Sequence, residues 1–169
     1  MEKETSISEK EFTITREFNA PKELVFNVFT KAEHLEKWWG PKGSEINVKT
    51  FDLRPGGKFH YSMKYQEGPE MYGVFVYHEI TPHDRIVFSS GFADETGNFI
   101  RAPFANTFPL EIKNTWTLTE KNGKTTLTLT GGPVKASSEE RAFYEGMFPS
   151  MQQGFAGTFD QLENYLSTL

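Results

Sequence analysis

Six strand-like stretches separated by turn signals, followed by one long amphipathic helix, constrain the fold of this chain more than any other feature. The stretches span residues 46–53, 58–65, 70–80, 85–92, 110–119 and 124–130. Paired glycines at Gly56-Gly57 and the dipeptide Asn122-Gly123 suit tight hairpin turns between neighbouring strands. Antiparallel hairpins that lead into one amphipathic helix predict an α+β domain.

One further strand and two short helices precede these hairpins. Alternation of apolar and polar residues predicts the first strand over residues 12–18. A helix follows from Pro21, which suits a first helical turn, with Asn19 as its expected cap. A second helix over about residues 31–39 ends at Gly40-Pro41, because proline cannot continue a helix.

The C-terminal tail, residues 138–169, has helical periodicity, and Pro149 is expected to divide or kink it. A curved antiparallel sheet of about seven strands would wrap around this helix and enclose space for a ligand. Gly146, Gly154 and Gly157 recur along one side of the tail. A glycine inside a helix costs about 1 kcal/mol relative to alanine. Close approach to a strand and space left for a ligand would both explain these glycines.

Composition bounds the class of protein. We expect one domain over residues 1–169, with residues 1–9 as a flexible tail. The net charge of −5 argues against a nucleic-acid surface, and the absence of cysteine excludes disulfides, thiolate catalysis and cysteine-bound zinc. No stretch approaches the roughly 20 apolar residues of a membrane span, and the N-terminus lacks the apolar run of a signal peptide. A cytoplasmic location without membrane or nucleic-acid partners is therefore expected.

Aromatic residues are frequent: the chain has 16 Phe, 6 Tyr and 3 Trp. This number predicts either an unusually aromatic core or rings that line a cavity. Candidate ligand-binding residues come from the second short helix, the inward faces of the strands and the C-terminal helix. They are Trp38, Trp39, Phe59, Tyr61, Met63, Phe75, Tyr77, Phe88, Ser90, Trp116, Met147, Met151, Phe155 and Phe159. Core packing is the competing interpretation for the tryptophans and the helical residues.

Ionisable candidates for catalysis are few. His60 and His78 alternate with the aromatic rows of the third and fourth strands, so we expect both to face solvent; with the faces inverted they would be the best general bases. Asp52, close to Arg54 at a hairpin corner, is either half of an acid–base pair or an anchor of the turn. The histidines form no metal-binding motif, and phosphate loops and dinucleotide fingerprints are absent. No metal and no cofactor is expected.

The segment 92–109 is long and carries Phe92, Phe99, Phe104 and Phe108 among Gly, Asn and Pro. Long connections in compact domains tend to be lids, binding loops or disordered segments, and the aromatic residues argue against disorder. We expect them to cover the mouth of the cavity; the alternative is that they are buried in the interface of a homodimer.

The order of these elements resembles the helix-grip fold of the START-like (SRPBCC) superfamily, which includes birch-pollen-allergen-like proteins and polyketide cyclases. Three motifs over residues 13–169 resemble the branch named for the activator of heat-shock-protein-90 ATPase homologues. They are Trp38-Trp39-Gly40-Pro41, Asp52-Leu53-Arg54-Pro55-Gly56-Gly57, and Gly154-Phe155 followed by Phe159-Asp160-Gln161-Leu162 and Tyr165-Leu166. Two features depart from the pattern: Phe155 stands where the family often has Trp, and segment 92–109 is longer and more aromatic.

The resemblance does not imply a chaperone-activating role for this chain. Eukaryotic co-chaperones of this branch carry a separate N-terminal domain that does much of the docking. The first strand here is expected to begin near Lys10, which leaves no room for such a domain. A chaperone partner is therefore the less favoured expectation.

The sequence favours one function over two alternatives. We expect a small hydrophobic or aromatic ligand to bind in an apolar cavity between the sheet and the C-terminal helix, as in a carrier or sensor. Ser90, Tyr61 or Tyr77 would orient the ligand. The first alternative is a cyclase- or hydrolase-like enzyme that uses cavity residues, and the second is a protein-interaction module. Whether the cavity is open or filled by the protein's own rings stays open.

Overall fold

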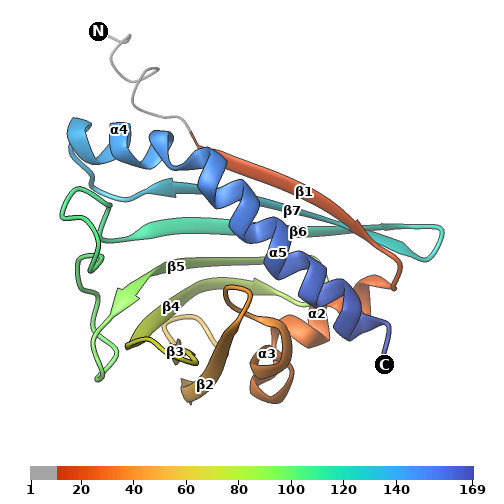
Figure 1. Cartoon of the computed structure of the whole chain (residues 1–169). Helices are drawn as coiled ribbons and strands as arrows, with labels where there is room; N and C mark the ends of the chain where they lie inside the picture. The colour runs from red at the N-terminus through yellow and green to blue at the C-terminus, as the bar shows by residue number, and fades with distance from the viewer. Residues whose placement is uncertain (1–10) are drawn as a thin grey trace, which may run out of the picture.

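The computed structural model describes residues 11–169, which form one seven-stranded sheet and four helices (Figure 1). The strands are β1 (Phe12–Phe18), β2 (Ser44–Phe51), β3 (Lys58–Tyr65), β4 (Glu70–Thr81), β5 (Arg85–Ala93), β6 (Ile112–Lys121) and β7 (Lys124–Pro133). The helices are α2 (Lys22–Phe29), α3 (Ala32–Trp38), α4 (Ser138–Gly146) and α5 (Phe148–Leu166). The N-terminal tail expected over residues 1–9 lies outside the described residues.

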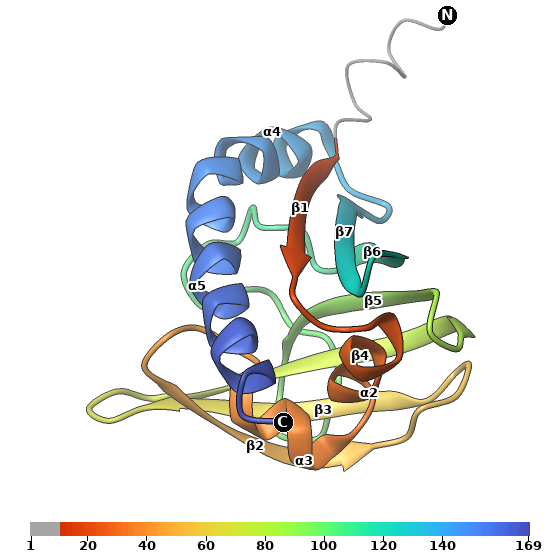
Figure 2. The same cartoon turned by 90° about the vertical axis from the view of Figure 1, so that its right-hand side faces the viewer.

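The sheet has the order β1-β7-β6-β5-β4-β3-β2, and each neighbouring pair is antiparallel. The sheet is curved, and α5 lies across its concave face (Figures 1 and 2). Helices α2 and α3 lie near the C-terminal end of α5, and α4 lies at its N-terminal end (Figure 1). The predicted α+β helix-grip fold, with seven strands and two short helices after the first strand, is confirmed.

The strand predictions agree with the structure within a few residues. β1 and β3 have the predicted bounds, whereas β6 begins at Ile112 instead of residue 110. β7 continues past residue 130 to Pro133. Between β6 and β7, Asn122 and Gly123 have φ values of 55° and 78°. Positive φ at both positions is what a two-residue type I′ hairpin turn requires, so the Asn-Gly prediction is confirmed.

The predicted cap of α2 is wrong. The N-cap position is occupied by Pro21 and makes no side-chain hydrogen bond, so Asn19 lies outside the helix. The first N–H groups of a helix lack partners within the helix. Glu120, near the end of β6, provides a partner for one of these groups: its Oε1 accepts a hydrogen bond from the Lys22 backbone N–H at 2.9 Å.

The helical tail is divided near Pro149, as predicted. α4 ends at Gly146, and Pro149 lies in the first turn of α5, where a backbone N–H is not needed. A β-carbon at Gly146 or Gly154 would meet nothing within 4 Å, and one at Gly157 would lie 4.0 Å from the Lys42 β-carbon. None of the three glycines lines the pocket described below, so close approach to a strand and space left for a ligand are both wrong explanations for them.

Candidate functional site

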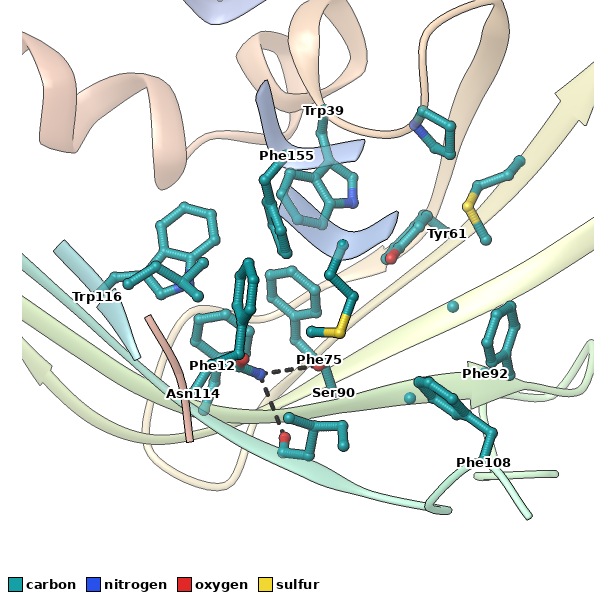
Figure 3. A pocket seen from close by; sticks show the side chains of 18 of the residues that line it. Phe12, Trp39, Tyr61, Phe75, Ser90, Phe92, Phe108, Asn114, Trp116 and Phe155 are labelled. Carbon is teal, nitrogen blue, oxygen red and sulfur yellow. Dashed lines mark hydrogen bonds between the residues drawn. The ribbon is translucent and has the colours of Figure 1, made fainter. Parts of the chain in front are cut away.

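A pocket of about 320 Å³ lies between the concave face of the sheet and the N-terminal half of α5 (Figure 3). Strands β3 to β6 supply most of its wall through alternate residues, which point to one face of a sheet. Helix α5 contributes Met151 and Phe155, and the segment after α3 contributes Trp39 and Pro41. The pocket thus joins residues that lie far apart in the sequence.

Most of the predicted ligand-binding residues line this pocket. They are Trp39, Tyr61, Met63, Phe75, Phe88, Ser90, Trp116, Met151 and Phe155. Their rings contact one another, with centroid distances of 5.4 Å between Trp39 and Phe75 and 4.2 Å between Phe75 and Phe88. The wall is therefore a nearly continuous aromatic surface.

The other predicted ligand-binding residues lie outside the pocket lining. They are Trp38, Phe59, Tyr77, Met147 and Phe159. Trp38 is 1% exposed, and its indole Nε1 donates to the Val28 carbonyl oxygen at 2.9 Å, so it anchors α3 in the core. Phe59, Tyr77 and Phe159 are buried in the same core, and Met147 lies at the junction of α4 and α5. Trp38 and Phe159 thus have the core-packing role that the sequence analysis gave as the competing interpretation, whereas for Phe59 and Tyr77 only ligand binding was expected.

Eleven further residues line the pocket but are not among the predicted ligand-binding residues. They are Phe12, Pro41, Met71, Gly73, Gly91, Phe92, Phe108, Ile112, Asn114, Leu129 and Tyr144. Strand alternation is a signal that could have found many of them: Ile112 and Asn114 precede Trp116 on the same face of β6. Tyr144 comes from α4, and no local pattern in the sequence places it against the sheet.

The polar side chains of the pocket floor form a hydrogen-bonded pair. Asn114 Nδ2 donates to Ser90 Oγ at 2.8 Å and to the Ile112 carbonyl oxygen at 3.2 Å (Figure 3). None of the residues that line the pocket in the described chain is Asp, Glu, Lys, Arg or His. Because a buried unpaired charge is costly, such a wall favours uncharged molecules.

Two tyrosines reach the pocket with perturbed hydroxyl groups. Burial raises the pKa of Tyr61 to about 12, and the neighbouring Trp39 indole lowers it by a smaller amount. Burial also raises the pKa of Tyr144, whose hydroxyl donates to the Gly131 carbonyl oxygen at 3.0 Å. Both hydroxyl groups therefore stay protonated and neutral at pH 7.

Asp52 and His78, two of the candidate catalytic residues, lie away from the pocket. Asp52 follows β2 and accepts hydrogen bonds from Arg54 Nε on both carboxylate oxygens, at 2.8 and 2.9 Å. It therefore anchors the turn, which is the second of the two expected roles. His78 is exposed, and its Nε2 lies 2.8 Å from Ser89 Oγ.

The prediction that His60 faces solvent is wrong, although the face assignment of β3 is right. His60 is 4% exposed on the outer face of the sheet, because a turn over residues 94–98 folds back over it. Its Nε2 lies 3.0 Å from the Asp94 carbonyl oxygen. Asp94 Oδ1 accepts hydrogen bonds from the backbone N–H groups of Thr96 and Asn98, and that of Asn98 contributes most to lowering the Asp94 pKa to about 2.

The remainder of segment 92–109 returns to the inner side of the sheet. Phe92 and Phe108 line one end of the pocket (Figure 3). Phe104 is 57% exposed and packs against both rings, with centroid distances of 5.6 and 5.7 Å. Arg101 pairs with Glu140 of α4, which ties this segment to the helical tail.

No three His, Cys, Asp or Glu side chains of residues 11–169 come together as a metal-binding group. The helices in the same range are all too short or too polar to cross a lipid bilayer.

Comparison with known proteins finds similarity over almost the whole chain. The family model described as Activator of Hsp90 ATPase homolog 1-like protein matches residues 19–167. Among solved structures, Ms6760 from Mycobacterium smegmatis is 28% identical with a TM-score of 0.75, over 94% of this chain and 91% of that one. A protein from Arthrobacter aurescens is 26% identical with a TM-score of 0.78, over 94% and 87% of the two chains. No curated protein matches the chain.

Proposed function

The chain belongs to the family of Activator of Hsp90 ATPase homolog 1-like proteins, and from this premise and the geometry of the pocket we propose that it binds a small hydrophobic or aromatic ligand between the sheet and α5. The observation that carries the proposal is the aromatic, uncharged wall around a volume of about 320 Å³. In this role the protein is a carrier or sensor.

The driving force is the burial of apolar surface. A ligand that buries about 300 Å² of apolar area gains roughly 7.5 kcal/mol at about 25 cal/mol per Å². Part of this gain offsets the loss of translational and rotational freedom on binding. Met63, Met71 and Met151 in the wall adapt their shape, since methionine is unbranched and flexible.

The alternative enzymatic function has less support. Its candidate residues, Asp52, His60 and His78, are absent from the pocket lining. They also lie apart from one another. Asp52 lies in the turn after β2, His60 lies beneath the turn over residues 94–98, and His78 is exposed on the surface. The proposal therefore assigns the pocket to binding.

The binding proposal is tested with N-phenyl-1-naphthylamine, a neutral dye that fluoresces in apolar surroundings. We expect saturable binding to the unaltered protein. Met151→Trp fills the pocket from α5 and should abolish it, whereas Gln152→Trp makes the same addition at an exposed neighbour and should leave it intact. Binding that survives Met151→Trp, or no binding to the unaltered protein, would contradict the proposal.

Native mass spectrometry, before and after organic extraction, then addresses the natural ligand. A co-purifying small molecule that disappears on extraction, and that Met151→Trp does not retain, supports the proposal and gives the ligand mass. A molecule retained equally by Met151→Trp binds elsewhere and argues against the pocket.

A further inference from the structure

The orientation of the Asn114 amide is fixed by its partners. Asn114 is 7% exposed, and one atom of its amide lies within hydrogen-bond distance of both the Ile112 carbonyl oxygen and Ser90 Oγ. A backbone carbonyl only accepts hydrogen bonds, so the atom that faces it must be the NH₂ group. The amide oxygen packs against Gly131, where a β-carbon would lie 2.7 Å from it. Both amide hydrogens are therefore used within the protein.

This arrangement sets the role of the Ser90 hydroxyl. Ser90 Oγ accepts the hydrogen bond from Asn114 Nδ2 at 2.8 Å. Within residues 11–169 the structure gives the hydroxyl hydrogen of Ser90 no acceptor, and Ser90 lines the pocket between Phe88 and Phe92 on β5. Ser90 therefore presents a hydrogen-bond donor to whatever occupies the pocket, and Asn114 is its positioning residue.

Tyr61 presents a second donor from β3. Its hydroxyl lies over Gly73 of β4, where a β-carbon would be only 2.5 Å from the hydroxyl oxygen, so glycine makes room for it. Among the described residues the buried Trp39 indole Nε1 has no hydrogen-bond partner, and it lies on the same side of the pocket as Tyr61 (Figure 3). The structure gives the Tyr61 hydroxyl no acceptor among the described residues, while its phenol stays protonated.

From these donors we propose that the ligand is an uncharged molecule that carries a hydrogen-bond acceptor, a carbonyl oxygen being the simplest, which the hydroxyl groups of Ser90 and Tyr61 hold. The inference rests on the proposed binding function of the same pocket. Tyr61 and Ser90 come from the two strands that flank β4, so both reach the space above its inner face (Figure 3). The absence of a charged lining residue in the described chain favours a carbonyl over a carboxylate.

A matched pair of ligands tests the inference. Fluorene and 9-fluorenone are flat tricyclic molecules of nearly the same shape, and only 9-fluorenone carries a carbonyl oxygen. Affinities are measured by displacement of N-phenyl-1-naphthylamine from the unaltered protein. We expect 9-fluorenone to bind at least tenfold more tightly than fluorene, since each satisfied buried donor strengthens binding.

Two pairs of variants locate the effect. Tyr61→Phe and Ser90→Ala each remove one hydroxyl from the pocket, and each should weaken 9-fluorenone several-fold while leaving fluorene unchanged. Tyr77→Phe and Ser89→Ala make the same chemical changes outside the pocket lining and should leave both affinities unchanged. The double variant of Tyr61→Phe and Ser90→Ala should bind the two ligands equally.

The outcomes separate the inference from the function on which it rests. Equal binding of fluorene and 9-fluorenone to the unaltered protein overturns the inference and leaves the binding function standing. If neither ligand binds and the dye is not bound, both fail. Should a variant not fold, the ¹³C shift of carbonyl-labelled 9-fluorenone bound to the unaltered protein decides: a downfield shift relative to an apolar solvent supports the two donors, and an unchanged shift overturns them.

Discussion

The two halves of α5 contact the same sheet in different ways. The buried residues of this helix all lie in its C-terminal half, and they are Thr158, Phe159, Leu162 and Leu166. In the N-terminal half, Met151 and Phe155 are only half-buried, because the surface they face is the pocket and not a packed core. One helix thus closes the fold at one end and leaves space for a ligand at the other.

Polar contacts strengthen the closed end. Thr158 Oγ1 donates to the Gly40 carbonyl oxygen at 2.9 Å, and Gln161 Nε2 donates to the carbonyl oxygens of Trp38 and Gly40 at 3.0 and 3.1 Å. These carbonyls lie at and beyond the end of α3, where helical carbonyls lack partners of their own. The Trp38-Trp39-Gly40-Pro41 motif and the motif around Gln161 therefore meet here, and their shared role is to join α3 to α5.

Polar contacts are weaker at the open end, where Arg16 Nη1 donates to the Ala156 carbonyl oxygen at a long 3.5 Å. Gly154 has no neighbour within 4 Å of a would-be β-carbon, and it lowers the helical propensity of this half of α5. Segments with few buried contacts open at lower free energy than the rest of a protein. We therefore expect ligand exchange to pass through the N-terminal half of α5.

The largest expected difference between the two halves of α5 is the loss of stability when a phenylalanine in each half is truncated to alanine. Phe159→Ala removes a fully buried ring and should lower the free energy of unfolding by about 3–5 kcal/mol. Phe155→Ala removes a half-buried ring beside a space that already exists, and should cost about 1–1.5 kcal/mol, half of the value for burying a whole phenylalanine side chain. Urea unfolding of the two variants measures both values, and equal losses would remove the distinction between the halves.

Removal of one hydrogen bond at the closed end should lower the free energy of unfolding by less than the loss of the Phe159 ring. Thr158→Val keeps the side-chain shape but leaves the Gly40 carbonyl oxygen with one hydrogen bond fewer, and should cost about 1–2 kcal/mol. Thr13→Val makes the same change at an exposed position of β1 and serves as the control. A loss at residue 158 no greater than at residue 13 would mean that this contact does not hold α3 to α5.

The sequence predicted the elements better than their contacts. Alternation and turn residues place every strand, because these signals are local. Trp38 and Trp39, although adjacent and alike, separate because α3 ends between them: Trp38 enters the core, while Trp39 adopts an extended backbone and lines the pocket. His60 is buried by a turn far along the chain, and Asn114 matters only through Ser90 on the next strand. Contacts of this kind depend on tertiary packing that no local pattern encodes.

A substitution that stiffens the N-terminal half of α5 should raise the free energy of unfolding by about 1 kcal/mol. Gly154→Ala adds a methyl group where nothing lies within 4 Å, so helical propensity alone decides the sign and the protein becomes more stable. Hydrogen exchange of the amides in residues 150–157 should slow, and dissociation of N-phenyl-1-naphthylamine should slow with it. Slower exchange with unchanged dye dissociation would show that the ligand leaves by another route.

The smallest expected effect concerns Asp94 and acidic pH, at the turn next to the pocket-lining Phe92. The pKa of Asp94 is lowered to about 2 in the folded protein, against about 3.9 for an ordinary aspartate. A lowered pKa stabilises the turn over residues 94–98 above about pH 4, and this contribution disappears as the pH falls through about 2. Amide exchange at Thr96 and Asn98, corrected for intrinsic rates, should therefore lose protection between pH 4 and 2. Asp94→Asn should remove this pH dependence, whereas Glu95→Gln, one residue along, should keep it. If protection persists to pH 2 in the unaltered protein, the carboxylate does not hold the turn, and His60 is covered by backbone contacts alone.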